Sequence, residues 1–351
     1  MTQRGAVLVD QSERVFAVIP TYGERLHLVS RVIEAALENG VKKVILVDNG
    51  TGSKSKACIG ALAGALSGKV TVVSLPENLG SAGGYKAGLE RALDCADCEY
   101  IWLLDDDNAP ANGALDALLV NNRSLNEGYA PDNLALLSLR EDRGYLEKLA
   151  GGVSIRRVFP NPSAFMGINL VNLPFQIVNL LRPKRPGTPS GGRNTPIKIP
   201  YGPYGGLFFH KSVVAKVGYP DERFFVYHDD TEYTHRLTQS GTALYLIPSS
   251  VIEELDHSWY LEAPGASIFA RLLSADSDFR VYYSTRNRVY FDKHLNKSSS
   301  MLYIINKFFF LTLLKCFSIK QKKQDRFALL IRAIRDGENR LLGRQKDIDP
   351  L

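Results

Sequence analysis

The chain has 351 residues, of which 45% are hydrophobic and 23% are charged. This composition describes a globular protein that can bury the core of one large or two ordinary domains, and it excludes a disordered chain. The net charge of +6 is unevenly distributed, because residues 284–351 carry 15 Lys and Arg against 6 Asp and Glu, which leaves the preceding residues at a net charge of −3. The basic tail therefore favours an acidic surface as partner, either anionic lipid or nucleic acid.

The cysteines and the first residues indicate where the protein works. Four cysteines, unevenly spread, fit a reducing compartment better than a disulfide framework. Cys95 and Cys98 have redox or zinc spacing, but no second pair accompanies them, so we favour a structural role. Residues 1–10 lack a charged segment followed by a long apolar core, so we expect no export and a cytoplasmic protein.

Buried strands and periodic helices alternate through the first 105 residues. The predicted strands cover 14–20, 43–48, 70–75 and 100–104, and the predicted helices cover 24–39, 55–66 and 85–93. This alternation predicts an α/β fold with a mostly parallel sheet covered by helices on both faces. Less regular segments follow, namely a helix at 112–126, a strand at 134–139, a flexible loop at 182–200 and strand-like runs at 243–248 and 251–256.

Three consecutive aspartates, Asp105, Asp106 and Asp107, follow the apolar run at 100–104. Adjacent carboxylates repel and are costly to desolvate, and a hard divalent ion such as Mg²⁺ or Mn²⁺ neutralises them. A solvated acidic turn or a helix cap is the alternative interpretation of the same residues.

Polar groups also follow the other predicted strands, at the edge where open parallel sheets bind ligands. Thr21 and Tyr22 follow the first strand, Asp48 the second, and a glycine-rich turn at 78–84 the third. Those glycines would allow a phosphate to approach backbone amides at a helix start, although an ordinary flexible turn is also possible. The turn at 20–25 lacks Gly-x-Gly-x-x-Gly, so a dinucleotide-binding fold is disfavoured.

A second acidic cluster, Asp229-Asp230-Thr231-Glu232, follows a run of aromatic residues. One aspartate could cap a helix predicted over 230–237. A carboxylate beside other acids and under aromatic cover would have a raised pKa, which suits a general base. Glycines and aromatics at 201–209 suggest a surface close under a sugar, and His257 is either a surface histidine or a metal ligand.

In order and spacing, these motifs resemble family-2 inverting glycosyltransferases of the GT-A fold, and within them the bacterial branch that contains rhamnosyltransferases and galactofuranosyltransferases. The resemblance spans 15–260 and rests on Pro20-Thr21-Tyr22, Val47-Asp48-Asn49-Gly50, the turn at 78–84, the run at 103–107, Gly205-Gly206-Leu207, Phe224-Phe225 and the cluster at 229–233. It implies a GT-A domain over 1–263, with a nucleotide-sugar half at 14–110 and an acceptor half at 111–263. A basic, helical C-terminal region covers 264–351.

The resemblance also implies roles for individual residues. Those that would bind the nucleotide sugar are Pro20, Thr21, Tyr22, Asp48, Asn78, Gly83, Gly84 and Asp106. Asp105, Asp107 and His257 would hold Mn²⁺ or Mg²⁺, and Asp230 would be the catalytic base. Contacts to the acceptor or to the donor sugar would come from Tyr204, Gly205, Gly206, His228 and Asp229.

The implied reaction moves a sugar, with inversion, from a nucleotide diphosphate sugar to a hydroxyl of a lipid-linked or polysaccharide acceptor in bacterial surface-glycan synthesis. Rhamnosyltransferases often carry Asp-Gln-Asp where this chain has three aspartates, so a UDP-sugar, with galactofuranose first, is favoured over dTDP-rhamnose. The chain departs from its relatives at His228, where Trp or Glu is frequent, and at 182–193, which has no counterpart. A two-metal phosphoesterase and a non-catalytic nucleotide-binding module remain alternatives of other classes.

The basic tail contains an apolar run at 301–319 that is interrupted by Lys307 and Lys315. The run is long enough to cross a bilayer, but two lysines near its middle make crossing costly. An interfacial helix on the anionic inner face of the plasma membrane is one interpretation, and a helix packed on the core or on a second subunit is the other. Nucleic acid is not expected as a partner, because no recognised reader motif accompanies the charge.

Overall fold

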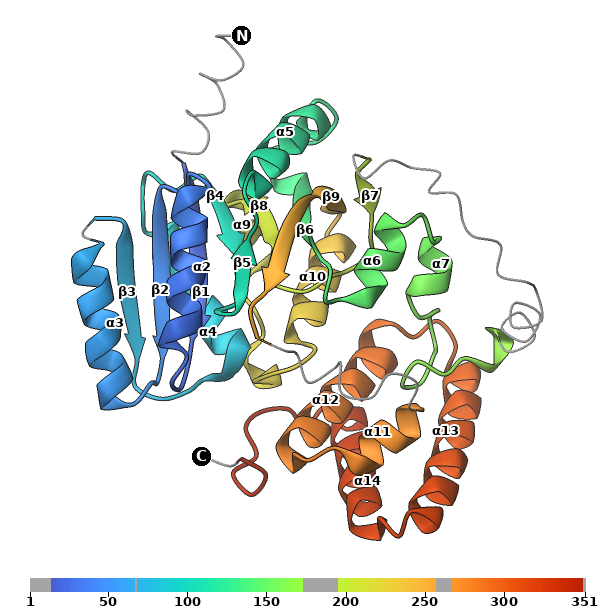
Figure 1. Ribbon diagram of the computed structural model, residues 1–351. Coiled ribbons are helices and arrows are strands. Elements are labelled where there is room, and N and C mark those ends of the chain that lie inside the picture. Colours follow the sequence, from blue (N-terminus) through green and yellow to red (C-terminus); the bar gives the residue numbers. More distant parts are fainter. Residues whose placement is uncertain (1–13, 67, 173–194, 257–266, 350–351) are drawn as a thin grey trace. The chain divides into compact units, whose positions relative to one another are not determined.

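The computed structural model describes residues 14–66, 68–172, 195–256 and 267–349 (Figure 1). These residues form two compact units. The first contains 14–153, 195–225 and 229–256, and the second contains 154–172, 226–228 and 267–349. The predicted domain boundary at 263 stays a prediction, since it falls outside the described residues, as do residues 182–194 of the predicted loop.

One sheet of nine strands, counted over the described residues, forms the centre of the first unit, with the order β3-β2-β1-β4-β8-β6-β9-β5 and β7 beside β9. The strands are β1 (Val15–Thr21), β2 (Lys43–Asn49), β3 (Val70–Leu75), β4 (Tyr100–Leu103), β5 (Asn108–Pro110), β6 (Leu134–Arg140), β7 (Ile197–Lys198), β8 (Leu207–His210) and β9 (Ala243–Glu254). Strands β1 to β4 pair in parallel, as predicted. Strand β8 runs antiparallel to both β4 and β6, so the second half of the sheet is mixed.

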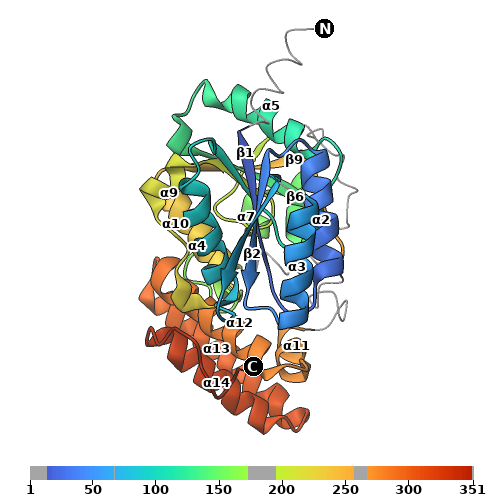
Figure 2. The same cartoon turned by 90° about the vertical axis from the view of Figure 1, so that its left-hand side faces the viewer.

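Helices cover both faces of this sheet. Figure 2 shows α2 and α3 on one side and α4, α9 and α10 on the other. The helices of this unit are α2 (Leu26–Glu38), α3 (Ser53–Ala65), α4 (Gly80–Leu93), α5 (Ala114–Asn126), α6 (Gly144–Ala150), α9 (Ser212–Val217) and α10 (Asp229–Gln239), with 3-10 turns at Pro131–Asn133 and Glu222–Phe224. Helix α2 buries residues at helical spacing, from Val29 through Val32 and Ile33 to Ala36, which explains why this segment packs as a helix on the sheet.

Helix α4 begins five residues earlier than the sequence predicts. The side chain of Asn49 receives the backbone N–H of Leu79 and donates to the carbonyl of Gly80, both at 2.9 Å, and this fixes the turn before the helix. Gly80 has a φ of +74°, and a Cβ there would lie 2.0 Å from the carbonyl oxygen of Phe225. The glycine-rich segment is therefore the tightly packed first turn of α4 and not a loose loop.

The two strand-like runs at 243–248 and 251–256 form one strand, β9. Its parallel register with β6 passes from Ser138 opposite Ile247 to Leu139 opposite Val251, so the intervening residues of β9 bulge out of the ladder. The polar residues of this bulge look like a strand break in the sequence, which is why one strand was predicted as two.

The second unit is helical. Its elements are α7 (Ile155–Val158), a 3-10 turn (Leu170–Asn172), α11 (Ile268–Ser274), α12 (Asp278–Tyr290), the π-helical turn η5 (Phe291–Leu295), α13 (Ser300–Lys320) and α14 (Gln324–Glu338). A separate apolar core holds them together, including Phe165, Val289, Phe310, Leu314 and Leu330. Helix α13 is long and apolar enough to cross a membrane by length and composition, and 28% of its most apolar window is buried.

Candidate active site

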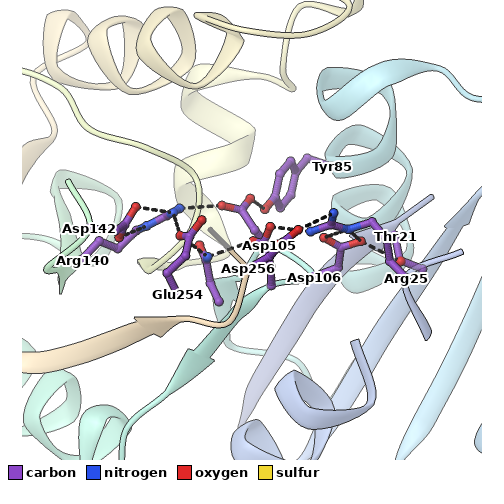
Figure 3. A network of polar contacts seen from close by, with 11 residues as sticks. Thr21, Arg25, Tyr85, Asp105, Asp106, Arg140, Asp142, Glu254 and Asp256 are labelled. Atoms are coloured by element: carbon purple, nitrogen blue, oxygen red, sulfur yellow. Dashed lines mark hydrogen bonds and ion pairs between the residues drawn. The ribbon is translucent and has the colours of Figure 1, made fainter. Parts of the chain in front are cut away.

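The acidic turn lies at the end of β4, beside the end of β1. The parallel pairing of these strands brings Thr21 to Asp106, and the Thr21 hydroxyl donates to Asp106 Oδ2 at 2.8 Å. Arg25 Nε donates to both carboxylate oxygens of Asp106 at 3.0 Å. The other nitrogens of the same guanidinium pair with Asp107 and, at 3.2 Å, with Asp256 (Figure 3). The single positive charge of Arg25 therefore partly offsets the negative charges of three carboxylates.

A second arginine holds the other side of the acidic cluster. Arg140 ends β6, and its side chain is only 1% exposed. Its guanidinium donates to Asp105 at 2.7 Å and to Asp142 at 3.0 Å, and also pairs with Glu254 (Figure 3). The hydroxyl of Tyr85 on α4 donates to the remaining oxygen of Asp105 at 2.6 Å. Asp105 is thus fixed from both sides.

Burial raises the pKa of several of these carboxyl groups. Burial raises the pKa of Asp106 to about 7, against the opposing effect of Arg25, and the charge of Asp107 adds to the rise. Burial, and then the charge of Asp105, raise the pKa of Asp107. Burial likewise raises the pKa of Glu254 to about 7 despite Arg140. Carboxylates crowded in this way attract additional positive charge.

The donor chemistry of this turn fits a hard divalent cation. Asp105 and Asp107 keep 34% and 21% of their side chains exposed, and Mg²⁺ sites commonly use one or two carboxylates together with substrate phosphates. Within the described residues, no group of three or more His, Cys, Asp or Glu is arranged to hold a metal by itself. His257, the third predicted ligand, lies outside the described residues.

Gly205 lies directly against the acidic network. A Cβ at this position would be 2.6 Å from Asp105 Oδ2 and 2.8 Å from Arg140 Nη1, so only glycine leaves both side chains in place. Its neighbour Gly206 has a φ of +97° and donates its N–H to the Leu103 carbonyl at 2.8 Å. The centre of the buried Tyr204 ring lies 4.4 Å from the centre of the Tyr85 ring. The Tyr204 hydroxyl has no hydrogen-bond partner in the part of the chain that the structure describes. The sequence motif 204–206 thus borders the acids.

Asp48 is the last residue but one of β2 and is 1% exposed. Its Oδ1 receives the N–H of Thr51 at 2.9 Å, while its buried Oδ2 has no hydrogen-bond partner among the described residues. Tyr22 is half exposed, and the Arg25 guanidinium lies 5.5 Å from the centre of its ring. Asp48 therefore retains a buried acceptor, and Tyr22 is a half-exposed aromatic residue beside Arg25.

Three of the four other residues predicted to bind the nucleotide sugar, Asn78, Gly83 and Gly84, pack closely in and before α4, and the fourth, Pro20, lies in β1. Asn78 receives the N–H of Gly80 at 2.8 Å. A Cβ on Gly83 would lie 2.5 Å from Leu79, and one on Gly84 would lie 3.0 Å from Pro20. These two glycines are buried where α4 meets the end of β1, so packing requires them, and their predicted contact with the diphosphate stays a prediction.

The second acidic cluster forms the first turn of α10. Asp229 is buried, and the Ser81 hydroxyl donates to its Oδ2 at 2.6 Å. Asp230 is partly exposed, and its Oδ1 receives both the N–H and the hydroxyl of Thr231, at 2.6 and 3.2 Å. Burial raises the pKa of both groups, and the charge of Asp105 adds to the rise at Asp230 while Arg143 opposes it. The two acidic clusters therefore influence one another electrostatically.

His228 belongs to the second unit, in the short segment 226–228. Burial, together with the charge of Arg288, lowers its pKa to about 3, and its buried Nδ1 has no hydrogen-bond partner among the described residues. The backbone φ is +64° at Tyr227 and +59° at His228, a region that non-glycine residues seldom adopt. The side-chain amide of Asn287 donates to the carbonyls of Val226 and Tyr227, both at 2.8 Å, and so holds this unusual backbone.

Sequence reasoning missed the positively charged half of the site. Arg25 stands in the same turn as Thr21 and Tyr22, and Arg140 is the charged last residue of a mostly apolar strand. Both were visible as charges at strand ends. The acidic partners Asp142 and Glu254 carried no comparable signal, because it is the folded sheet that brings both of them to Arg140.

Comparison with known proteins agrees with this architecture. Residues 16–121 match the family model described as Glycosyl transferase family 2. The structure of GalNAc-T7 with UDP, GalNAc and Mn²⁺ shares 12% identity with this chain at a TM-score of 0.50, over 84% of this chain and 54% of that one. The mannosyltransferase PcManGT from Pyrobaculum calidifontis, in complex with GDP-Man and Mn²⁺, shares 14% identity at a TM-score of 0.48, over 92% and 86% of the two chains. TarS of S. aureus shares 12% identity at a TM-score of 0.45, over 93% and 55%.

The chain thus covers about half the length of GalNAc-T7 and of TarS. No curated protein matches it. The sheet flanked by helices, with its acidic turn after β4, has the GT-A fold, the class that the order of the sequence motifs predicted. More particularly, the segment that contains Thr21, Asp48 and Asp105 to Asp107 matches glycosyl transferase family 2. The rhamnosyltransferase and galactofuranosyltransferase branch stays a prediction.

Proposed function

We propose that the protein is a metal-dependent inverting glycosyltransferase that moves a sugar from a UDP-linked donor, with galactofuranose our first choice, to a hydroxyl of a lipid-linked or polysaccharide acceptor in bacterial surface-glycan synthesis. The observation that carries the proposal is the convergence of Thr21, Asp48 and Asp105 to Asp107 at the carboxyl ends of β1, β2 and β4 in a segment that matches glycosyl transferase family 2. The UDP and Mn²⁺ bound in the GalNAc-T7 structure support a nucleotide-sugar donor and a divalent ion.

The donor side of the site offers groups suited to a nucleoside. The buried, unpartnered Oδ2 of Asp48 can accept a hydrogen bond from an N–H or O–H of the base or ribose, which would remove the cost of leaving it unsatisfied. The half-exposed Tyr22 directly follows Thr21 in the chain. The Thr21 hydroxyl already donates a hydrogen bond to Asp106. Asp106 therefore orients the end of β1 from inside the site.

Asp105 and Asp107 would hold Mn²⁺ or Mg²⁺, with His257 as the further predicted ligand. When bound, such an ion neutralises the developing charge of the diphosphate leaving group. Arg140 and Tyr85 keep the Asp105 carboxylate in one orientation, and Arg25 does the same for Asp107. These contacts preorganise the carboxylates, so little rearrangement is needed when the donor binds.

Asp230 would act as the base. Both hydrogen bonds from Thr231 fall on its Oδ1, which leaves Oδ2 to take the proton of the acceptor hydroxyl. The oxygen of the acceptor hydroxyl would attack the anomeric carbon from the face opposite the diphosphate. The new glycosidic bond would then form as the bond between the anomeric carbon and the phosphate oxygen breaks. The raised pKa of Asp230, caused first by burial, suits a group that must accept a proton near neutral pH.

A cytoplasmic location, where nucleotide sugars are expected as substrates, belongs to the same proposal. It is supported by the cysteines, since Cys58, Cys95, Cys98 and Cys316 are all free thiols. Free thiols are typical of a reducing compartment.

The test is the release of nucleoside diphosphate from UDP-galactofuranose and dTDP-rhamnose in the presence of Mn²⁺. We expect Asp230→Asn to keep the affinity for the nucleotide but to lose turnover by about 10²–10⁴-fold, the size of a general-base contribution. Asp97→Asn, a change at a surface ion pair with Lys42, is the control and should leave both quantities unchanged. Undiminished turnover in Asp230→Asn would contradict the assignment and move the role to Asp229 or Glu232. Preference for dTDP-rhamnose would replace the first-choice donor.

A further inference from the structure

Helix α13 has two opposite faces. One face carries Tyr303, Phe310 and Leu314, which are buried in the apolar core of the second unit against residues of α11 and α14. This face also carries the buried Asn306, whose side chain donates to the Ser163 carbonyl at 2.9 Å and receives the N–H of Leu170. The inner face is therefore fully used by packing and hydrogen bonds within the unit.

The opposite face of α13 is apolar but open to solvent. We call it the outer stripe, and its exposed apolar residues are Met301 (68%), Ile304 (62%), Ile305 (42%), Phe308 (73%) and Ile319 (59%). Met301, Ile304, Ile305 and Phe308 fall within two turns, and Ile319 follows Phe308 by eleven residues, or about three turns, so all five lie along one side of the helix. Of the twelve large hydrophobic residues that are exposed in the described part of the chain, these five lie on one helix. Such a concentration marks an interaction surface, because single exposed apolar residues are normally scattered.

The stripe is surrounded by lysines. Residues 293–323 contain seven lysines and no aspartate or glutamate. Five of them are exposed, namely Lys297, Lys315, Lys320, Lys322 and Lys323. An apolar stripe flanked by positive charge is complementary to the surface of an anionic bilayer, where apolar side chains enter the acyl boundary and ammonium groups meet lipid phosphates.

A groove of about 520 Å³ runs beside the stripe, in the second unit. Its walls combine the lysines Lys293, Lys297 and Lys307 with the apolar side chains of Ile304, Phe308 and Leu311. Lys307 also pairs with Glu338 on α14 at 2.6 Å, which holds its charge at the wall of the groove. Positive and apolar groups therefore adjoin one another in this groove, which the paired Glu338 also lines, and this combination suits a lipid phosphate and the start of its acyl chains.

We propose that the outer stripe of α13 is a membrane-docking surface that takes the anionic phospholipid surface of a bilayer, with the helix lying in the interface. Spanning the bilayer is disfavoured, because it would expose to lipid the polar contacts of Asn306 and break the pair between Lys307 and Glu338. A second copy of the chain is also disfavoured, because a symmetric contact would bring the exposed lysines of one stripe against those of the other, and Glu338, which lines the groove beside the stripe, is already paired with Lys307. The proposal goes beyond the reaction and does not depend on it.

The test is flotation of the full chain with vesicles of phosphatidylglycerol and phosphatidylcholine in equal parts, and with vesicles of phosphatidylcholine alone. We expect binding to the anionic vesicles, weaker binding as salt is raised, and little binding to the neutral ones. The double variant Ile304→Ser, Phe308→Ser should bind the anionic vesicles about tenfold more weakly or worse, since two large apolar side chains lose their burial. The control Val120→Ser removes an apolar side chain of α5 that is also more than half exposed, and it should bind like the parent.

A second variant, Lys322→Glu with Lys323→Glu, changes only exposed charge just after the end of α13 and should also weaken binding to anionic vesicles. Because all four substituted side chains are exposed, both variants should keep the parent's thermal unfolding, which circular dichroism measures. Equal binding of parent and Ile304→Ser, Phe308→Ser would overturn the proposal. A second result would also overturn it: the parent is dimeric by light scattering and fails to float with anionic vesicles, while the variant Ile304→Ser, Phe308→Ser is monomeric. That result would assign the stripe to a second copy of the chain.

Discussion

Replacing Gly205 by alanine would place a methyl group inside the acidic network. An ideal Cβ there lies 2.5 Å from Asn108 Oδ1, 2.6 Å from Asp105 Oδ2 and 2.8 Å from Arg140 Nη1. Ordinary contact begins at 3.4 Å, so the Asp105 carboxylate must retreat by about 0.8 Å. Backbone strain does not enter, because the φ of Gly205 lies outside the left-handed region. The perturbation is therefore one of space alone.

We expect Gly205→Ala to lower the free energy of unfolding by about 1–3 kcal/mol, the usual cost of overpacking a buried site. Turnover should fall by about 100-fold, because a displacement near 1 Å of a positioning group costs rate on that scale. Denaturant unfolding and nucleoside diphosphate release measure the two effects. The control is Gly60→Ala, on the exposed side of α3 with nothing within 4 Å, which should stabilise the helix by about 0.5–1 kcal/mol. Unchanged turnover in Gly205→Ala would refute the placement of this glycine against Asp105.

Two further predictions concern buried charge. Arg140→Met should lower the free energy of unfolding by about 3–5 kcal/mol, because it leaves buried carboxylates without their counter-ion, whereas Arg14→Met at the surface pair with Glu99 should cost less than about 1 kcal/mol. Equal losses of unfolding free energy in the two variants, measured by denaturant unfolding, would contradict the role of Arg140 as a buried counter-ion. Burial and Arg288 lower the pKa of His228 from 6.5 to about 3. Below pH 6.5 the unfolded chain therefore binds a proton that the folded chain does not. The contribution of this neutral histidine to stability is complete above pH 6.5 and is lost as the pH falls toward 3. Between about pH 8 and about pH 5 the wild type should therefore lose about 2 kcal/mol more than His228→Gln; the same loss in both would rule out a buried neutral imidazole.

The first half of the sheet could be predicted from the sequence because its signals are local. Each of the strands β1 to β4 is a short apolar run, and the helices between them show their own periodicity. The rule that parallel strands end at one edge then brings Thr21 to Asp106, as the hydrogen bond between them shows. The insertion of β8 between β4 and β6 was not predicted, because pairings such as Ile101 with Phe209 join residues far apart in the chain.

The charge partners of the site could not be predicted for the same reason. Arg25 meets Asp256 across 231 positions, and Arg140 meets Glu254 across 114. Residue type indicates that an arginine will find an acid, but only the folded sheet decides which one. The glycines of α4 show a different limit, since the sequence signature of Gly83 and Gly84 does not reveal the close packing against Leu79 and Pro20 that the structure shows.

The proposed function depends most directly on the acidic turn as a nucleotide and metal site. The measurement that tests it is calorimetric titration of UDP, GDP and dTDP into the full chain with and without Mn²⁺. We predict that UDP binds only in the presence of Mn²⁺, that Asp107→Ala abolishes this binding, and that Asp230→Asn keeps it. Failure of every nucleoside diphosphate to bind the wild type in the presence of Mn²⁺ would contradict the proposed glycosyltransferase function.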